Sequence, residues 1–115
     1  MSPRSAGAGA PAPGHTAPLF AALGDETRLA LVDRLCAHGP LSITQLTLGS
    51  AVTRQAIPKH LHILAAAGLV HDTRRGRERT WTLDTARLDE VRGYLDQIAQ
   101  QWDAALGRLK MFVED

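Results

Sequence analysis

At 115 residues, the chain is long enough for one domain with a modest hydrophobic core and too short for two. A hydrophobic content of 44% and a charged content of 22% are typical of a globular protein. No apolar run approaches the roughly 20 residues of a membrane span, and the N-terminus has no hydrophobic signal core. The single cysteine, Cys36, excludes an intramolecular disulfide, so we expect a cytoplasmic protein.

The formal net charge of +1 is unevenly distributed along the chain. Residues 53–83 hold six basic and two acidic side chains, a net charge of +4, whereas residues 84–115 have a net charge of −3. Residues 1–52 are neutral overall. Only the middle third could therefore attract a polyanion such as nucleic acid, although charge alone is equally compatible with a solvated basic hairpin.

The first residues are low in large apolar side chains. Residues 1–16 are mostly Gly, Ala, Pro and Ser, which predicts a flexible tail. A short helix should follow, with Pro18 at its first position. Asp25 is then placed to cap a helix over residues 26–38. The apolar stripe that we expect on this helix is formed by Leu29, Val32, Leu35 and Cys36.

The next elements have clear local signals. Ser42 and Gln45 have the spacing of a capping box, which predicts the start of a short helix. Thr53 is a good N-cap for the helix that follows. Two β-prone segments around Gly76 predict an arginine-rich hairpin. A long amphipathic helix is expected over residues 84–115.

A helix pair followed by a hairpin is typical of the winged helix-turn-helix fold, whose second helix enters the DNA major groove. We therefore predict a mainly α fold with a small β-hairpin. The expected units are the tail over residues 1–16, a winged helix-turn-helix DNA-binding domain over residues 17–83 and a dimerisation helix over residues 84–115. A protein-interaction module could have the same order of elements, so the chemistry of the exposed faces must decide.

The second helix of the pair has two distinct faces. Ile57, Leu61 and Leu64 share one side of a helical wheel, which should face the core. The opposite side carries polar and basic groups that can bond base edges or neutralise phosphate. The residues that we assign to DNA binding are Thr53, Arg54, Gln55, Pro58, Lys59 and His62 on this helix, and Arg74, Arg75, Arg77 and Arg79 on the hairpin.

The hairpin separates two classes of function. A protein-interaction module without DNA binding would expose apolar residues there, whereas the segment TRRGRER exposes none. DNA binding is therefore the favoured interpretation. A DNA-binding repressor released by a small-molecule or redox signal remains an alternative, because the sequence does not identify an effector.

Three stretches resemble the ArsR-type winged-helix repressors: ALGDETRLALVDRL, TRQAIPKHLHILAAAGLV and RRGRERTWTL. The closing WDAALGRLKMFVED resembles a branch of that family with a long C-terminal helix, so the resemblance covers nearly the whole chain. It implies a homodimeric transcriptional repressor that binds a roughly palindromic operator. The residues that it implies at bases are Arg54, Gln55 and Pro58, with Arg75 and Arg77 on the wing.

This chain departs from its relatives at Pro58, where Ser or Thr is usual. With Thr53 as the cap, Pro58 would be the fifth helical residue, and its missing N–H would forfeit a bond to the carbonyl of Arg54. We therefore expect a loosened or kinked first turn over residues 54–57 and a regular helix over residues 58–67.

Neither metal binding nor catalysis is expected. Metal sensing in the family uses a cysteine pair in the first helix of the motif or Asp and His ligands in the last helix, and the matching segments here contain no Cys or His. His60 and His62 lie two residues apart on a helix and cannot hold one ion together. Cys36 is expected to be a small core residue. No nucleophile motif or acid–base pair appears, so we predict no cofactor and no enzyme activity.

The last predicted helix carries a long apolar stripe. Its apolar positions alternate in steps of three and four residues, which is a coiled-coil pattern. A small domain cannot cover a stripe about 40 Å long by itself. We therefore expect dimerisation through this helix, aided by the short first helix. The expected dimerisation residues are Leu19, Phe20, Leu88, Val91, Leu95, Ile98, Trp102, Leu109 and Phe112.

Overall fold

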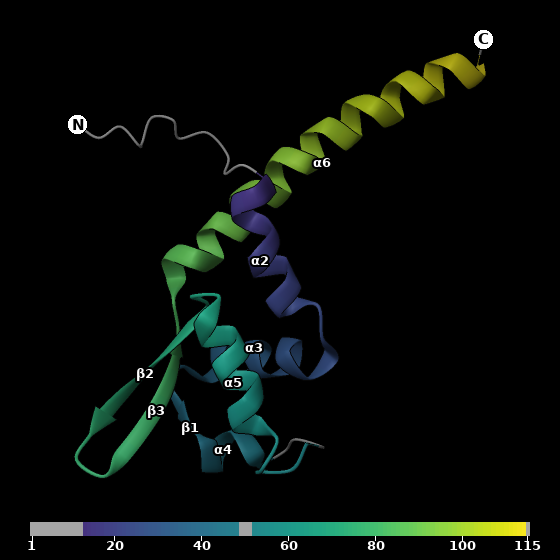
Figure 1. The fold of residues 1–115 in the computed structure, drawn as a ribbon. Coiled ribbons are helices and arrows are strands. Elements are labelled where there is room, and N and C mark those ends of the chain that lie inside the picture. The colour runs from purple at the N-terminus through teal and green to yellow at the C-terminus, as the bar shows by residue number, and fades with distance from the viewer. Residues whose placement is uncertain (1–12, 49–51, 115) are drawn as a thin grey trace, which may run out of the picture.

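The computed structural model describes residues 13–48 and 52–114. The helices are α2 (Pro13–Leu23), α3 (Glu26–His38), α4 (Ile43–Thr47), α5 (Ile57–Ala66) and α6 (Thr85–Glu114). The strands are β1 (Leu41–Ser42), β2 (Val70–Arg75) and β3 (Glu78–Leu83), which form one antiparallel sheet in the order β1-β3-β2 (Figure 1). The mainly helical fold with a small hairpin is as predicted.

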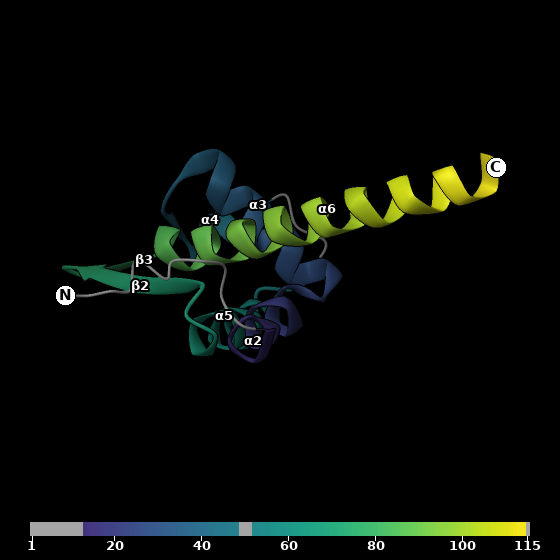
Figure 2. The ribbon, with the colours of Figure 1, turned by 90° about the horizontal axis from the view of Figure 1, so that it is seen from above.

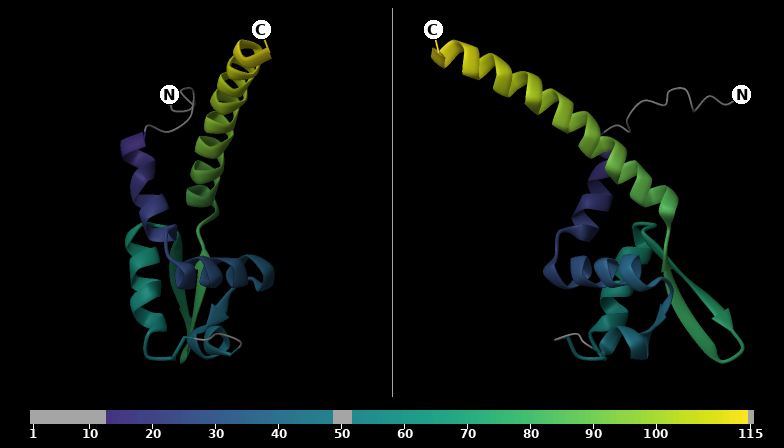
Figure 3. Two further views of the ribbon diagram at one scale, coloured as in Figure 1. Left: turned by 90° about the vertical axis from the view of Figure 1, so that its right-hand side faces the viewer. Right: turned by 180° about the vertical axis from the view of Figure 1, so that it is seen from behind.

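The hydrophobic core lies where α3 and α5 pack against each other and against the sheet (Figure 3). Ile57, Leu61 and Leu64 of α5 are completely buried, as the helical wheel predicts. Trp81 of β3 is also buried, with 3% of its surface exposed. This core fixes one face of α5 inward and therefore holds its polar face outward.

The C-terminal half of the long helix α6 extends beyond the rest of the domain. Near its start it packs against α2, where the rings of Phe20 and Tyr94 lie 5.8 Å apart between centroids. Beyond this contact α6 projects away from the other helices, which Figure 2 shows from above. Across the described ranges, every helix is too short or too polar to span a lipid bilayer.

Helix α2 begins earlier than predicted. It starts at Pro13, so residues 13–16 are helical and Pro18 lies inside the helix rather than at its first position. The first turns of α2 contact α6, and Thr16 is 1% exposed. The Gly- and Pro-rich composition of this segment and the missing N–H of Pro18 both disfavour a helix. The packing against α6 outweighs them. The rest of the predicted tail, residues 1–12, lies outside the described residues.

The buried stripe of α3 differs from the prediction. Leu31, Val32 and Leu35 are buried, whereas Leu29 is 47% exposed and Cys36 is exposed. Each residue turns a helix by about 100°, so Leu29 lies on the side opposite Leu31. The prediction that Leu29 and Cys36 belong to the core was wrong.

The predicted capping box is confirmed at the start of α4. The Ser42 hydroxyl accepts a bond from the Gln45 amide at 3.2 Å, and the Gln45 side chain accepts one from the Ser42 amide at 2.9 Å. The strand β1 just before it was not predicted. It is two residues long and is defined by pairing with the distant Trp81 and Thr80, so it has no local sequence signal.

Candidate nucleic-acid interface

The outward face of α5 is the first part of the candidate interface. Gln55, Lys59 and His62 are exposed, and Pro58 is half-buried. Lys59 and His62 lie on α5, whose opposite side is buried in the core, and Gln55 lies in the turn just before it. An exposed amide, an ammonium group and an imidazole on one surface can bond base edges and phosphates.

The chain before α5 shows how Pro58 is accommodated. The helix begins at Ile57, so Pro58 lies in its first turn, where the missing N–H costs no intrahelical bond. Residues 54–56 form a separate turn, in which the Thr53 hydroxyl accepts a bond from the Ala56 amide at 3.3 Å. The prediction of Thr53 as the N-cap of α5 was wrong, because that position is Ala56. The predicted loosening of the first turn is found as this short turn.

Strand pairing shows on which face of the hairpin each paired arginine lies. Arg74 pairs with Arg79, and Arg75 pairs with Glu78. Because side chains alternate along a strand, Arg74 and Arg79 share the face of Trp81, whereas Arg75 and Glu78 lie on the other face. Trp81 faces α5, since its ring centroid lies 6.5 Å from that of His62 in an edge-on arrangement. Of the paired arginines, Arg74 and Arg79 are therefore continuous with the outward face of α5, and Arg75 is not.

Arg77 lies at the tip of the hairpin. It forms the two-residue turn together with Gly76, whose φ of +62° favours glycine. Arg77 is exposed there. It can therefore approach a partner ahead of the rest of the hairpin.

Arg79 is held in place by two neighbours. Its Nε donates a hydrogen bond to Asp72 Oδ2 at 2.6 Å, and its guanidinium lies 4.8 Å from the centre of the Trp81 ring. The hydrogen bond from Arg79 holds the pKa of the Asp72 carboxyl below its usual value. Asp72 therefore stays charged and partly neutralises the hairpin at neutral pH.

We expect Asp72→Asn to strengthen binding to any DNA duplex, because it removes one negative charge and frees Arg79 from its ionic partner. The logarithm of the binding constant should fall with the logarithm of salt concentration more steeply, by up to about one unit. Fluorescence anisotropy over a salt series measures both effects. The exposed Asp89→Asn on α6 makes the same charge change at a distance, and an equal effect there would contradict a local role for Asp72.

The same ion pair predicts a pH dependence of stability. Because Arg79 lowers the folded-state pKa of Asp72, the pair stabilises the hairpin above the unfolded-state pKa of the carboxyl. That stabilisation is lost as the pH falls through the lowered folded-state value. Thermal unfolding from neutral to acidic pH should therefore show a smaller acid-dependent decrease for Asp72→Asn than for the unchanged chain.

The apolar stripe of α6 is only partly covered by its own chain. Val91 is 8% exposed, and Leu19 of α2 is 4% exposed. Further along, Trp102 is 65% exposed and Phe112 is 81% exposed. The expected dimerisation set thus divides into residues that belong to the core of one chain and a C-terminal group that lies at the surface. The exposed members of the expected set are Leu95, Trp102, Leu109 and Phe112, and three further apolar side chains on α6 are also exposed: Leu106, Met111 and Val113.

No family model matches the chain. The HTH-type transcriptional regulator Rv2034 of Mycobacterium tuberculosis is 42% identical over 85 residues, which cover 74% of this chain and 76% of that protein. The arsenical resistance operon repressor of Bacillus subtilis is 33% identical over 78 residues, which cover 68% of this chain and 71% of the repressor. The solved ArsR-like transcriptional regulator from Rhodococcus sp. RHA1 is 36% identical with a TM-score of 0.70, covering 86% of this chain and 92% of that one. The chain belongs to the ArsR-type family of winged helix-turn-helix transcriptional regulators.

Membership confirms the resemblance found in the sequence and names the parts of the structure. In this ArsR-type regulator, α4 and α5 form the helix-turn-helix, α5 takes the position of the recognition helix in that fold, and β2 with β3 forms the wing. Its named relatives are transcriptional regulators. Among the described residues, no group of three or more His, Cys, Asp or Glu side chains could hold a metal ion.

Arg34 supports the helix-turn-helix and was missed in the sequence. From α3, its guanidinium donates hydrogen bonds to the carbonyls of Gln45, Leu46 and Leu48 at 3.0, 2.7 and 2.6 Å. These carbonyls end α4, where backbone acceptors lack helical partners. One planar guanidinium therefore caps the first helix of the motif and fixes it to α3.

Arg28 links α5 to the helices before it. Its Nε donates to the carbonyl of Ala22 at 2.5 Å, and its Nη1 lies 3.3 Å from His60 Nδ1. His60 is half-buried on α5, and its ring also lies 3.8 Å from Asp25. The two contacts of His60 orient α5 from its inner side and join residues that lie far apart in sequence.

Proposed function

We propose that this chain is a homodimeric transcriptional repressor that binds a roughly palindromic operator through α5 and the wing. The observation that carries the proposal is an exposed polar surface formed by Gln55 in the turn before α5 and by Lys59 and His62 on α5. The ring of His62 lies 6.5 Å from that of Trp81, and Arg79 of the wing lies 4.8 Å from the same Trp81 ring. The apolar face of α5 is buried in the core, so the orientation of its polar face is fixed. A rigid helix with such a face suits the DNA major groove.

The exposed stripe of α6 supports the homodimer. Trp102, Leu109 and Phe112 are more than half exposed in the single chain. A contiguous apolar patch of this kind marks an interaction surface. A second copy offers the same stripe, and two-fold symmetry would place two recognition helices on successive turns of one DNA face.

The relatives support regulation rather than catalysis. The Bacillus subtilis relative is named a repressor, and the Mycobacterium tuberculosis relative is named a transcriptional regulator. We propose repression of transcription by occupation of an operator, with no catalytic step and no cofactor. Such a protein acts on chromosomal DNA, which agrees with the cytoplasmic location expected from the sequence.

Fluorescence anisotropy of the purified protein tests this proposal. The probes are the DNA upstream of its own gene and a scrambled duplex of equal composition, over a salt series. Tight binding to the upstream duplex alone, weakening steeply with salt, would support an operator and phosphate contacts. No binding to either duplex at low salt would overturn the proposal and favour a protein-interaction module.

Substitutions of Gln55, in the turn before α5, and of Lys59, on α5, should have different consequences. Gln55→Ala should relax the base preference at one operator position, a loss of about 1–3 kcal/mol of discrimination, because a side-chain amide can pair with an adenine edge. Lys59→Ala should weaken binding to all duplexes equally and reduce the salt slope by about one. Anisotropy on operator variants measures both, with the exposed Gln100→Ala on α6 as the control. Equal losses on every duplex for Gln55→Ala would contradict a base contact.

A further inference from the structure

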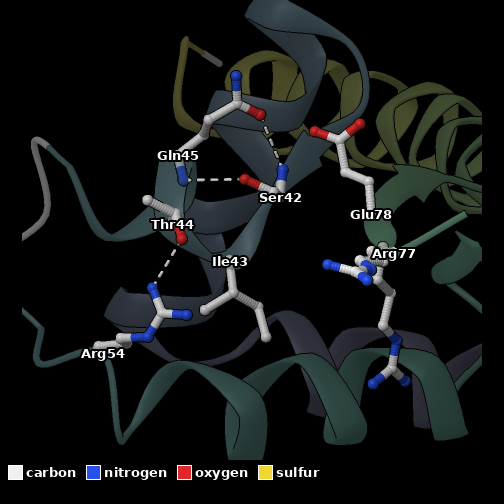
Figure 4. A pocket seen from close by; sticks show the side chains of 8 residues that line it. Ser42, Ile43, Thr44, Gln45, Arg54, Arg77 and Glu78 are labelled. Atoms are coloured by element: carbon white, nitrogen blue, oxygen red, sulfur yellow. Dashed lines mark hydrogen bonds between the residues drawn. The ribbon is translucent and has the colours of Figure 1, made fainter. Parts of the chain in front are cut away.

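A groove of about 500 Å³ lies between α4 and the wing. Thr44 and Arg54 stand on one side, and Arg77 and Glu78 stand on the other (Figure 4). Ile43 lies between the two sides. The groove thus brings together cations from two elements that are far apart in sequence.

Arg54 is one of the residues that the resemblance implies at bases. Its Nη1 donates a hydrogen bond to the Thr44 hydroxyl at 2.7 Å, which directs the side chain toward the groove (Figure 4). Gln55, the next residue, is exposed in the turn before α5. A guanidinium has five N–H donors, and this bond uses one of them. Arg54 can therefore still bind an anion inside the groove.

The charged side chains of the groove favour an anionic ligand. Ser42 and Gln45 also line the groove, but their side chains bond each other's backbone amides in the capping box. The arginine side chains that line the groove are Arg54, Arg77 and Arg79, against the single carboxylate of Glu78. Three cations against one carboxylate favour an anionic ligand such as the phosphate oxygens of DNA.

The groove is continuous with the recognition helix. Arg79 lines it and lies 4.8 Å from the centre of the Trp81 ring, and the ring of His62 lies 6.5 Å from that of Trp81. Trp81 therefore joins the groove to the outward face of α5. A DNA strand at the edge of the major groove occupied by α5 would pass this point.

We infer that the groove between α4 and the wing binds the phosphodiester backbone of DNA, with Arg54 and Arg77 as its phosphate contacts. This inference rests on the proposed DNA-binding function and assigns Arg54 a different role from Gln55. Arg54 supplies affinity without sequence preference, and Gln55 supplies base discrimination. Glu78 limits the affinity of the groove for DNA of any sequence.

The test compares affinity, salt slope and specificity for substitutions in the groove. Arg54→Ala and Arg77→Ala should each reduce the slope of log affinity against log salt by about one. Each should weaken binding to the upstream and scrambled duplexes by the same factor, so the ratio of the two affinities stays unchanged. Glu78→Gln should strengthen binding to both. Circular dichroism confirms that each variant is folded.

The substitution Arg54→Lys distinguishes a phosphate contact, which needs only the positive charge, from a base contact, which needs paired hydrogen bonds. Lysine keeps the charge but lacks the planar guanidinium fork, so it replaces an arginine poorly where two bonds to one base edge are required. A phosphate contact predicts a salt slope and a specificity ratio close to those of the unchanged chain. A collapse of the ratio with an unchanged slope, for either Arg54 variant, would overturn the inference. Failure of the unchanged chain to bind DNA would instead overturn the proposed function together with it.

The groove could also bind a free phosphate-bearing ligand instead of the phosphates of DNA. Inorganic phosphate added at constant ionic strength should not displace DNA from the protein if the groove serves the DNA backbone. Displacement that disappears in Arg54→Ala would overturn the inference and assign the groove to a free phosphate-bearing ligand.

Discussion

A chain carrying Trp102→Glu and Leu109→Glu will be a monomer that binds a two-half-site operator at least about 100-fold more weakly, because only one half-site is then engaged. Trp102 and Leu109 are 65% and 59% exposed in the single chain, on the apolar stripe of α6. A tryptophan buries about 150–250 Å² in an interface, and an unpaired carboxylate in its place is strongly unfavourable there. Sedimentation velocity and anisotropy on the same samples measure the two effects.

The matched control adds the same two charges on the polar side of α6. Gln97 and Gln100 are exposed and face away from the stripe, so Gln97→Glu with Gln100→Glu should leave the dimer intact. A dimer of unchanged stability in the Trp102 and Leu109 variant would show that α6 does not hold the two copies together. Loss of the dimer in both variants would indicate a general effect of charge.

Arg34→Ala will lower the free energy of unfolding by about 2–3 kcal/mol, because it leaves three carbonyls at the end of α4 without their donor. The estimate is below the sum for three charged hydrogen bonds because the guanidinium is only half-buried. Arg34→Lys should lose most of this energy as well. A single ammonium group cannot reach three carbonyls in the geometry of the planar guanidinium.

Chemical denaturation at one fixed protein concentration measures this change, since the stability of a dimer depends on concentration. Arg92→Ala on α6 is the control, because Arg92 is also a helical arginine but is exposed. A loss of less than about 0.5 kcal/mol for Arg34→Ala, the range expected of surface positions, would contradict its supporting role.

The parts of the fold that follow from local physics were predicted from the sequence. The spacing of Ile57, Leu61 and Leu64 determines both the buried and the outward face of α5. The Ser42–Gln45 capping box and the turn at Gly76 are also short-range features, and each is found where it was predicted. The apolar and polar sides of the recognition helix could therefore be assigned before the structure was known.

The errors arose where the sequence pattern is degenerate or where distant residues decide. Helix α3 contains LALV and LCA, so several apolar stripes fit it, and tertiary packing selects Leu31 rather than Leu29 or Cys36. The early start of α2 depends on packing against α6. The bonds of Arg34 to α4 and of Arg54 to Thr44 join residues that lie about ten or more positions apart. No local pattern encodes these pairings.

Selection of bound duplexes from a random DNA pool tests the central claim that this chain is a dimeric, sequence-specific DNA-binding protein. The account predicts enrichment of an inverted repeat whose half-site centres lie one helical turn, about 10 base pairs, or a multiple of it apart. Weak binding without enrichment, or enrichment of a single half-site with no repeat, would contradict the account.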